Sequence, residues 1–244
     1  MVYQNIFKRY ELKYLLTHPQ KEAVIAAMAA FMAPDQYGRT TIRNLYFDTD
    51  NYRLIRRSLE KPVYKEKLRL RSYRQCSPGD PAFMELKKKY KSVVYKRRMA
   101  LPEQEALAWL SGDSPGPDGQ IADEVRSFFT YYGQLTPKVF LAYDRQAWYC
   151  TDGSDFRVTF DENILCRQEQ LSLEAPVWGS PILPKDRILM EIKTAGGIPL
   201  WMSHVLNGQH IYKTTFSKYG TAYENLILPK WKHIHSSKYR SERL

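Results

Sequence analysis

The sequence Lys67-Leu68-Arg69-Leu70-Arg71 alternates strictly between basic and apolar residues. A period of two predicts a β-strand, because successive side chains of a strand point to opposite faces. The three cations therefore share one face and the two leucines share the other. Like charges on one face of a sheet repel each other and destabilise it. This strand alone is compatible both with an exposed basic surface and with a site that binds an anion.

The same pattern recurs in other parts of the chain. Residues 83–89 place Glu85 and Lys87 on one side and Met84 and Leu86 on the other. The turn sequence Ser77-Pro78-Gly79-Asp80-Pro81 predicts that this stretch returns antiparallel to the first strand. Four further pairs of ionisable residues share a face of a predicted strand, with Arg145 as a single contributor: Glu11/Lys13, Lys96/Arg98, Arg157/Asp161 and Glu191/Lys193.

So many charged strand faces are typical of a closed antiparallel barrel with a polar interior, and we count roughly eight predicted strands. Helices are predicted between them over residues 20–32, up to residue 58, from residue 102, over 121–132, over 199–205 and after 217. We therefore expect an α+β fold, an eight-stranded antiparallel β-barrel tunnel with a polar, basic interior and peripheral helices. Residues 1–229 are expected to form a single domain and residues 230–244 a basic C-terminal tail.

The composition narrows the classes of partner. The 244 residues carry a net charge of +11, which favours a polyanionic partner. The three cysteines, Cys76, Cys150 and Cys166, are widely spaced, which argues against a disulfide framework or a zinc site and fits a reducing compartment. No stretch approaches the roughly 20 apolar residues that a membrane span needs. We therefore expect a cytoplasmic protein without a membrane span.

A basic interior needs anions, because unpaired buried charge is costly. Arginine and lysine match phosphate oxygens, and a few carboxylates among them suit a divalent ion, since Mg²⁺ and Mn²⁺ take one or two carboxylates together with phosphate oxygens. The pattern therefore predicts a tunnel lined with groups that bind phosphate. The basic runs at residues 87–91 and 95–98 also invite nucleic-acid binding, but half of their members have inward roles, so no nucleic acid is expected.

An ordered set of motifs carries a family resemblance. At Glu11-Leu12-Lys13, Lys67-Leu68-Arg69-Leu70-Arg71, Glu85-Leu86-Lys87, Arg145, Arg157, Glu191-Ile192-Lys193 and Phe216-Ser217-Lys218-Tyr219, the chain resembles the VTC domain. That is the catalytic domain of the vacuolar transporter chaperone polyphosphate polymerase, in the triphosphate tunnel metalloenzyme superfamily. Two positions depart from the pattern: Arg9 replaces the first acid of the first strand, and Thr215 replaces a lysine, with Lys213 nearby as a substitute.

The resemblance implies a role for each matching residue. The expected catalytic residues are Lys13, Arg69, Arg71, Lys87 and Lys218. The expected phosphate-binding residues are Lys96, Arg145, Arg157, Lys193 and Ser217, with the choice between Lys96 and Arg97 open. The expected ligands of Mn²⁺ or Mg²⁺ are Glu191 as the principal one, with Glu11 and Glu85.

The implied function is that of a metal-dependent phosphotransferase that acts on ATP or another triphosphate and on inorganic polyphosphate, with ATP-dependent polyphosphate synthesis as the expected reaction. The alternatives are an inorganic or nucleoside triphosphatase and a polyphosphate-binding module without turnover. An acidic partner is a further expectation for the basic tail.

Overall fold

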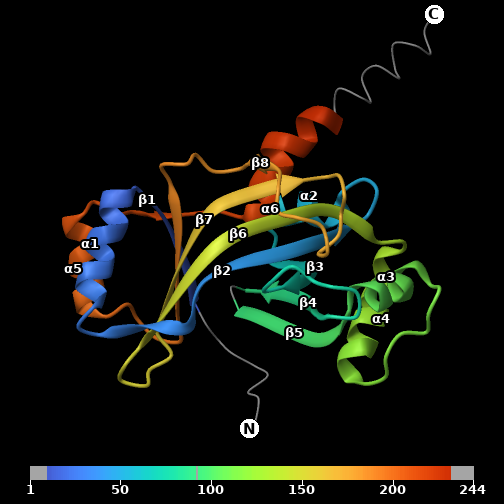
Figure 1. The fold of residues 1–244 in the computed structure, drawn as a ribbon, viewed down its shortest axis with the longest axis horizontal. Helices are drawn as coiled ribbons and strands as arrows, with labels where there is room; N and C mark the ends of the chain where they lie inside the picture. The colour runs from blue at the N-terminus through green and yellow to red at the C-terminus, as the bar shows by residue number, and fades with distance from the viewer. Residues whose placement is uncertain (1–9, 92, 232–244) are drawn as a thin grey trace, which may run out of the picture.

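The computed structural model describes residues 10–91 and 93–231, and within them ten strands form one antiparallel sheet. The strands are β1 (Tyr10–Leu16), β2 (Met32–Asp48), β3 (Tyr64–Ser72), β4 (Pro81–Tyr90), β5 (Val93–Pro102), β6 (Thr136–Cys150), β7 (Arg157–Arg167), β8 (Ser180–Pro181), β9 (Ile188–Thr194) and β10 (Lys213–Thr214). Their order across the sheet is β10-β1-β9-β7-β6-β2-β3-β4-β5, with β8 paired to β7 (Figure 1).

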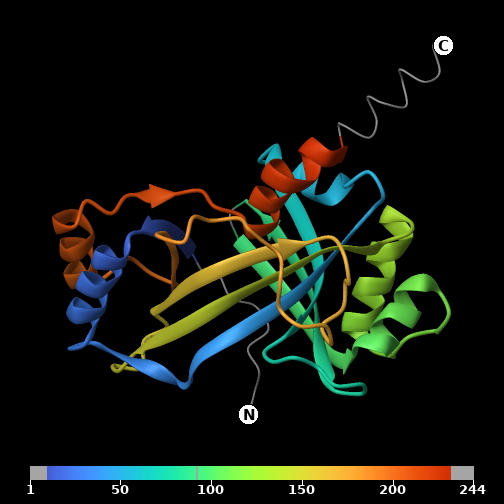
Figure 2. The same cartoon turned by 45° about the horizontal axis from the view of Figure 1, so that its top comes forward.

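Helices pack against this sheet in three groups. The helices are α1 (His18–Met28), α2 (Arg53–Leu59), α3 (Glu103–Ser111), α4 (Gln120–Tyr132), α5 (Leu200–Gly208) and α6 (Lys218–Ala222), which continues into the π-helical turn η1 (Tyr223–Ile227). Helices α1 and α5 lie side by side at one end of the molecule, α3 and α4 lie at the other end, and α2 and α6 lie between them (Figures 1 and 2).

Each group of helices packs on one apolar part of the sheet. Leu68 and Leu70 of β3 are fully buried in a cluster with residues of α3 and α4. A second cluster joins β2, β6 and β7 to α2 and α6, and a third joins β1, β7 and β9 to α1 and α5. In the first and third clusters the apolar side chains of the strands point outward, so the alternate, charged side chains point to the concave inner face. The second cluster lies on the inner face itself, because its Tyr46 lies opposite Arg69 of β3 in the ladder. The predicted alternation on β3 is thus confirmed.

The predicted closed barrel is wrong. Among the described residues the sheet is open, and its edge strands β10 and β5 are not paired with each other. Strand β10 has only two residues and cannot extend a ladder of backbone hydrogen bonds. The chain around Ser217 occupies the gap instead: the Lys13 ammonium donates to the Phe216 carbonyl at 2.9 Å, and the Lys67 ammonium donates to Ser217 Oγ at 3.0 Å. A third side-chain bridge, from Lys87 to Glu11 at 3.2 Å, joins β4 to β1.

Several predicted boundaries also differ from the structure. Helix α1 ends at Met28 and not at residue 32, and β2 begins at Met32 and runs through Pro34. A proline is tolerated there because the pairing with β6 shifts register between Pro34 and Arg39. Residues 157–167 form one continuous strand.

A few expectations cannot be placed. The start of the first strand before Tyr10, the residue Arg9, and residues 232–244 of the basic tail lie outside the described residues. None of the helices in residues 10–91 and 93–231 has the length and apolar character needed to cross a bilayer.

Candidate active site

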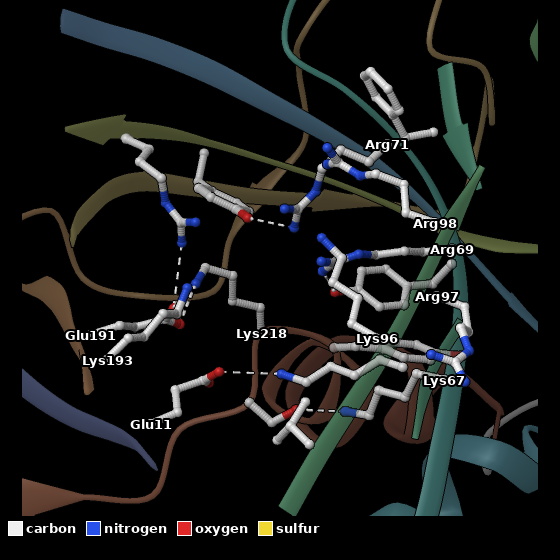
Figure 3. A pocket seen from close by; sticks show the side chains of 18 of the residues that line it. Glu11, Lys67, Arg69, Arg71, Lys96, Arg97, Arg98, Glu191, Lys193 and Lys218 are labelled. Atoms are coloured by element: carbon white, nitrogen blue, oxygen red, sulfur yellow. Dashed lines mark hydrogen bonds and ion pairs between the residues drawn. The ribbon is translucent and has the colours of Figure 1, made fainter. Parts of the chain in front are cut away.

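The concave face of the sheet encloses a cavity of about 1530 Å³. Twelve lysines and arginines line it, and among the described residues only two acids, Glu11 and Glu191, do so. Figure 3 shows Glu11, Glu191 and Lys193 on one side of the cavity, facing a row of basic side chains from β3 and β5 on the other. The basic residues are Lys13, Lys67, Arg69, Arg71, Lys87, Lys96, Arg97, Arg98, Arg145, Arg157, Lys193 and Lys218.

All the predicted site residues except Glu85 line this cavity. The register of β5 answers the question of Lys96 or Arg97. Lys96 pairs with Lys87 across the ladder and points to the inner face, where its ammonium lies 2.7 Å from Glu85. Arg97 touches the cavity too, but its Nε donates to Glu124 of α4 at 2.9 Å. Lys213 is exposed on β10 and does not line the cavity, so it does not take the place of the missing lysine.

Glu85 lies beneath the row of cations and is only 1% exposed. The Arg69 and Arg98 guanidinium groups both reach its carboxylate at 2.6 Å, and Lys96 reaches it at 2.7 Å. Burial alone would raise the pKa of Glu85, but Arg69, Arg71 and Lys96 outweigh this and hold it well below its usual range. The carboxylate is therefore ionised and fully engaged by protein cations.

A second acidic centre lies on the opposite wall. Asp161 of β7 is completely buried, and both of its oxygens accept from the Arg145 guanidinium, at 2.6 and 2.7 Å. The Lys218 ammonium bridges Asp161 at 2.5 Å and Glu191 at 3.1 Å. Lys13 likewise bridges Glu191 at 3.3 Å and Glu11 at 3.2 Å. Two ammonium groups thus link three carboxylates into one network.

The acids of this network are ionised. Burial would raise the pKa of Glu191, but Lys218, Lys13 and Lys193 outweigh this and hold it well below its usual range. Lys87 lowers the pKa of Glu11. Conversely, burial would lower the pKa of Lys13, yet the neighbouring Glu191 and Glu11 raise it. The network is therefore a set of fixed charges near neutral pH.

Two cations of the cavity have no nearby carboxylate in the described part of the chain to compensate their charge. No carboxylate of the described residues lies within 4 Å of Lys67 or Arg157, unlike Lys13 or Arg69. Burial, with added repulsion from Lys87 and Lys13, lowers the pKa of Lys67 to about 7. Burial also lowers the pKa of Arg157, and its buried Nε has no hydrogen-bond partner. Because an unpaired buried cation is costly, both positions favour the arrival of an anion.

Sequence reasoning missed several residues of the cavity. Lys67 was recognised on the charged face of its strand but was not included in the predicted site, yet it lines the cavity and reaches Ser217. Asp161 and Arg98 were recognised as inward-facing but were not included in the predicted site. Two tyrosines, Tyr46 and Tyr143, carry no charge signal, yet their hydroxyls accept hydrogen bonds from Arg69 at 2.9 Å and from Arg71 at 3.1 Å. Strand parity could have identified the charged residues but not the tyrosines.

The donor set fits a divalent ion that binds together with phosphate. Among the described residues there is no group of three or more His, Cys, Asp or Glu side chains that could cage a metal ion. Glu191 and Glu11 lie on either side of one ammonium group and line the cavity. One or two carboxylates are what Mg²⁺ requires when phosphate oxygens complete its shell. Glu85 does not fit, because its carboxylate is only 1% exposed and does not line the cavity.

Comparisons with known proteins agree with this architecture. Among solved structures, a proposed adenylate cyclase from Bacillus halodurans superposes with a TM-score of 0.56 at 16% identity, covering 88% of this chain and 96% of the other. A proposed adenylyl cyclase from Hippeastrum, described as having a dominant triphosphatase activity, gives a TM-score of 0.51 at 14% identity, covering 86% and 93%. The comparison with curated proteins finds no significant match.

These two likenesses show a shared fold, that of tunnel-like structures built on an antiparallel sheet. The family comparison goes further, because residues 8–227 match the VTC domain. The match covers most of the chain and includes every motif on which the resemblance was based. The chain therefore belongs to the VTC domain family.

Proposed function

We propose that this protein is a metal-dependent phosphotransferase that acts on triphosphate and polyphosphate, and that it synthesises inorganic polyphosphate from ATP. The observation that carries the proposal is the cavity itself, in which twelve basic side chains face two acidic ones. Two of those cations, Lys67 and Arg157, have no carboxylate partner among the described residues. A chain of phosphates is the ligand whose repeated charge matches a continuous basic lining.

In this proposal the protein positions two phosphate groups and neutralises charge. The terminal phosphoryl group of ATP passes to an oxygen at the end of a phosphate acceptor. The bond between the β–γ bridging oxygen and the γ-phosphorus breaks, a new phosphoanhydride bond forms, and ADP leaves with the bridging oxygen. Lys13, Arg69, Arg71, Lys87 and Lys218 offset the negative charge that develops on the transferred group and on the leaving oxygen. No side chain serves as a covalent nucleophile.

Glu191 and Glu11 would hold the divalent ion, whose charge would offset part of the negative charge of the phosphate groups. Lys96, Arg145, Arg157, Lys193 and Ser217 bind phosphate oxygens in this proposal. Glu85 has a different role from the one that the family resemblance implies. It fixes Arg69 and Arg98 from below, at 2.6 Å from each, so that their remaining N–H groups face the cavity.

Triphosphate hydrolysis is the second candidate activity. The same arrangement transfers a phosphoryl group to water when no phosphate acceptor is present, and the structurally similar Hippeastrum protein is described as having a dominant triphosphatase activity. A polyphosphate-binding module without turnover is the third candidate. The presence of Glu191 among the cations favours catalysis over simple binding, because an acid weakens the binding of an anion unless a metal ion lies between them.

The test supplies ATP with Mn²⁺ or Mg²⁺, with and without a short polyphosphate primer. Products are resolved on a gel for long-chain polyphosphate, and free phosphate is measured in parallel. The matched variants are Lys87→Ala and Lys88→Ala. These neighbours lie on one strand, but Lys87 reaches Glu11 across the cavity and Lys88 pairs with Glu124 of α4 on the outside.

Long-chain product that is lost in Lys87→Ala and kept in Lys88→Ala would support the polymerase. Release of phosphate without a polymer would identify a triphosphatase. Binding of polyphosphate without turnover of ATP would identify a binding module. Equal activity of the wild type and Lys87→Ala would contradict the placement of the site.

A further inference from the structure

Two arginines of the cavity stack on aromatic rings. The Arg98 guanidinium carbon lies 4.2 Å from the centre of the Phe83 ring and 5.5 Å from that of Tyr73. The Arg157 guanidinium carbon lies 4.5 Å from the centre of the Tyr149 ring. All three distances are within the range of favourable cation–π contact. We call these five residues the aromatic–arginine cluster.

The cluster lies at the rim of the cavity. Phe83, Arg98 and Arg157 are among the residues that line it, whereas Tyr73 and Tyr149 lie beside them and are 41% and 43% exposed. One half of the cluster comes from the end of β3 and from β4 and β5, and the other half from β6 and β7. The two halves face the same cavity, because Phe83 and Arg98 of one half and Arg157 of the other all line it.

The two arginines differ in their free binding capacity. Arg98 is held by Glu85, whereas Arg157 has no carboxylate within 4 Å among the described residues, and its buried Nε is unpaired. The rim therefore combines two features: accessible aromatic rings and a guanidinium group that is not neutralised. An inorganic phosphate chain would use only the guanidinium group. A ligand with a planar aromatic ring attached to its phosphates uses both.

We propose that the aromatic–arginine cluster is a binding subsite for the base of a nucleoside triphosphate, whose phosphates extend from Arg157 into the cavity. The inference rests on the proposed function, since it names the part of the substrate that the phosphate-binding residues leave outside. Bases stack on aromatic rings and on guanidinium planes. Stacking uses the π-face that every base has, so the subsite distinguishes nucleotides from inorganic triphosphate but discriminates little among the bases.

The experiment compares two ligands by isothermal titration calorimetry on the full chain: the non-hydrolysable imido analogue of ATP, and inorganic tripolyphosphate. The variants are Tyr149→Ala, Tyr149→Phe and Tyr73→Ala. Tyr212→Ala is the control, because this tyrosine is exposed and lies outside both the cavity lining and the cluster. Circular dichroism confirms that each variant is folded.

We expect Tyr149→Ala to weaken binding of the ATP analogue by about 5- to 150-fold, the range for loss of one base–aromatic stack, and to change tripolyphosphate affinity by less than about twofold. Tyr149→Phe keeps the ring and should bind like the wild type. Tyr73→Ala gives a second, independent loss, and the GTP analogue should bind about as tightly as the ATP analogue, within roughly threefold.

Three results would overturn the inference. An equal loss for both ligands in Tyr149→Ala would mean that the ring only holds Arg157 in place. No loss in either alanine variant would mean that the base lies elsewhere. Failure of the wild type to bind either ligand would overturn the proposed function as well. Selective loss of the ATP analogue, combined with absence of phosphoryl transfer, would leave the subsite standing and refute only the proposed reaction.

Discussion

Replacing Lys67 with methionine should change the number of protons that accompany phosphate binding. Lys67 donates to Ser217 Oγ at 3.0 Å, and burial together with Lys87, Lys13, Lys65 and Arg69 lowers its pKa to about 7. A triphosphate that enters among these cations supplies the missing negative charge and raises the pKa of Lys67 again. Binding above neutral pH must therefore protonate this amine.

The expected magnitude follows from the pKa. At pH 8.5 a group with a pKa of about 7 is roughly 3% protonated, so the complex should take up nearly one proton at Lys67. Other groups contribute too, including Lys193, whose pKa burial lowers to about 8. The ligand also exchanges protons. These contributions are common to the wild type and to Lys67→Met, so the difference between the two proteins isolates Lys67.

The assay is calorimetric titration with tripolyphosphate at pH 8.5 in several buffers with different heats of ionisation. The slope of the observed enthalpy against the buffer enthalpy gives the number of protons taken up. We expect the slope of Lys67→Met to be lower than that of the wild type by about one proton. Lys138→Met, which removes a partner of Asp50 outside the cavity, should leave the slope unchanged. Equal slopes for the wild type and Lys67→Met would refute the reasoning.

The same pKa predicts how the stability of the empty protein depends on pH. The unfolded chain keeps Lys67 protonated up to about pH 10.5, whereas the folded protein loses this proton near pH 7. The unfolded state therefore binds more protons between these values, and the contribution of Lys67 to the free energy of unfolding rises with pH across this window, by at most about 5 kcal/mol in total. Thermal melts of the wild type and Lys67→Met between pH 6 and 9.5 would test the sign.

Three further predictions follow from the buried groups. Glu85→Gln should lower the free energy of unfolding by about 3–5 kcal/mol, because it leaves Arg69 and Arg98 without their buried counter-charge, and tripolyphosphate should restore more stability to this variant than to the wild type in urea melts. Tyr219→Phe removes the hydroxyl that donates to buried Asp48 at 3.0 Å, and should cost about 1–3 kcal/mol without loss of the ring contacts, as measured by the same melts. Glu191→Gln should bind tripolyphosphate more tightly than the wild type in EDTA, because one acid has been removed from an anion site, yet lose metal-dependent turnover; weaker binding in EDTA would contradict this.

Strand parity predicted most of the cavity. On β3, the rule that alternate side chains share a face identified Arg69 and Arg71 as inward and Leu68 and Leu70 as outward, and the structure agrees. The same rule separates Lys87 from Lys88. The alternation of side chains depends only on the sequence of each strand. The inward and outward residues could therefore be predicted from this one sequence.

Whether the sheet closes could not be predicted from strand parity. Whether β5 pairs with the first strands depends on the curvature accumulated over the whole sheet and on what fills the last gap. The filling segment is the chain around Ser217, which lies 150 residues after Lys67 in the sequence and contacts it through one side-chain hydrogen bond. The wrong prediction of a closed barrel has this cause.

The different roles of the individual acids could not be predicted from the sequence either. Glu85 and Glu191 both occur as Glu-x-Lys on a charged strand face, and the local pattern is the same. Their difference arises from the assembled sheet: Glu85 lies beneath Arg98 and Lys96 of β5 and does not line the cavity, whereas Glu191 lies with Glu11 on the cavity wall. Only the assembled sheet shows which carboxylate remains accessible.

The gap between the two edges of the sheet has a consequence for how a polymer could enter the cavity. In a closed barrel, a long phosphate chain must be threaded through one end, and its release is slowed in proportion to its length. Here the described residues bridge the gap by side chains, through Lys87 with Glu11 and Lys67 with Ser217, and not by a backbone ladder. In the proposed function, phosphate would compete for the cation of each bridge. We therefore expect an arriving phosphate chain to weaken these two contacts, and a polymer to be laid in from the side.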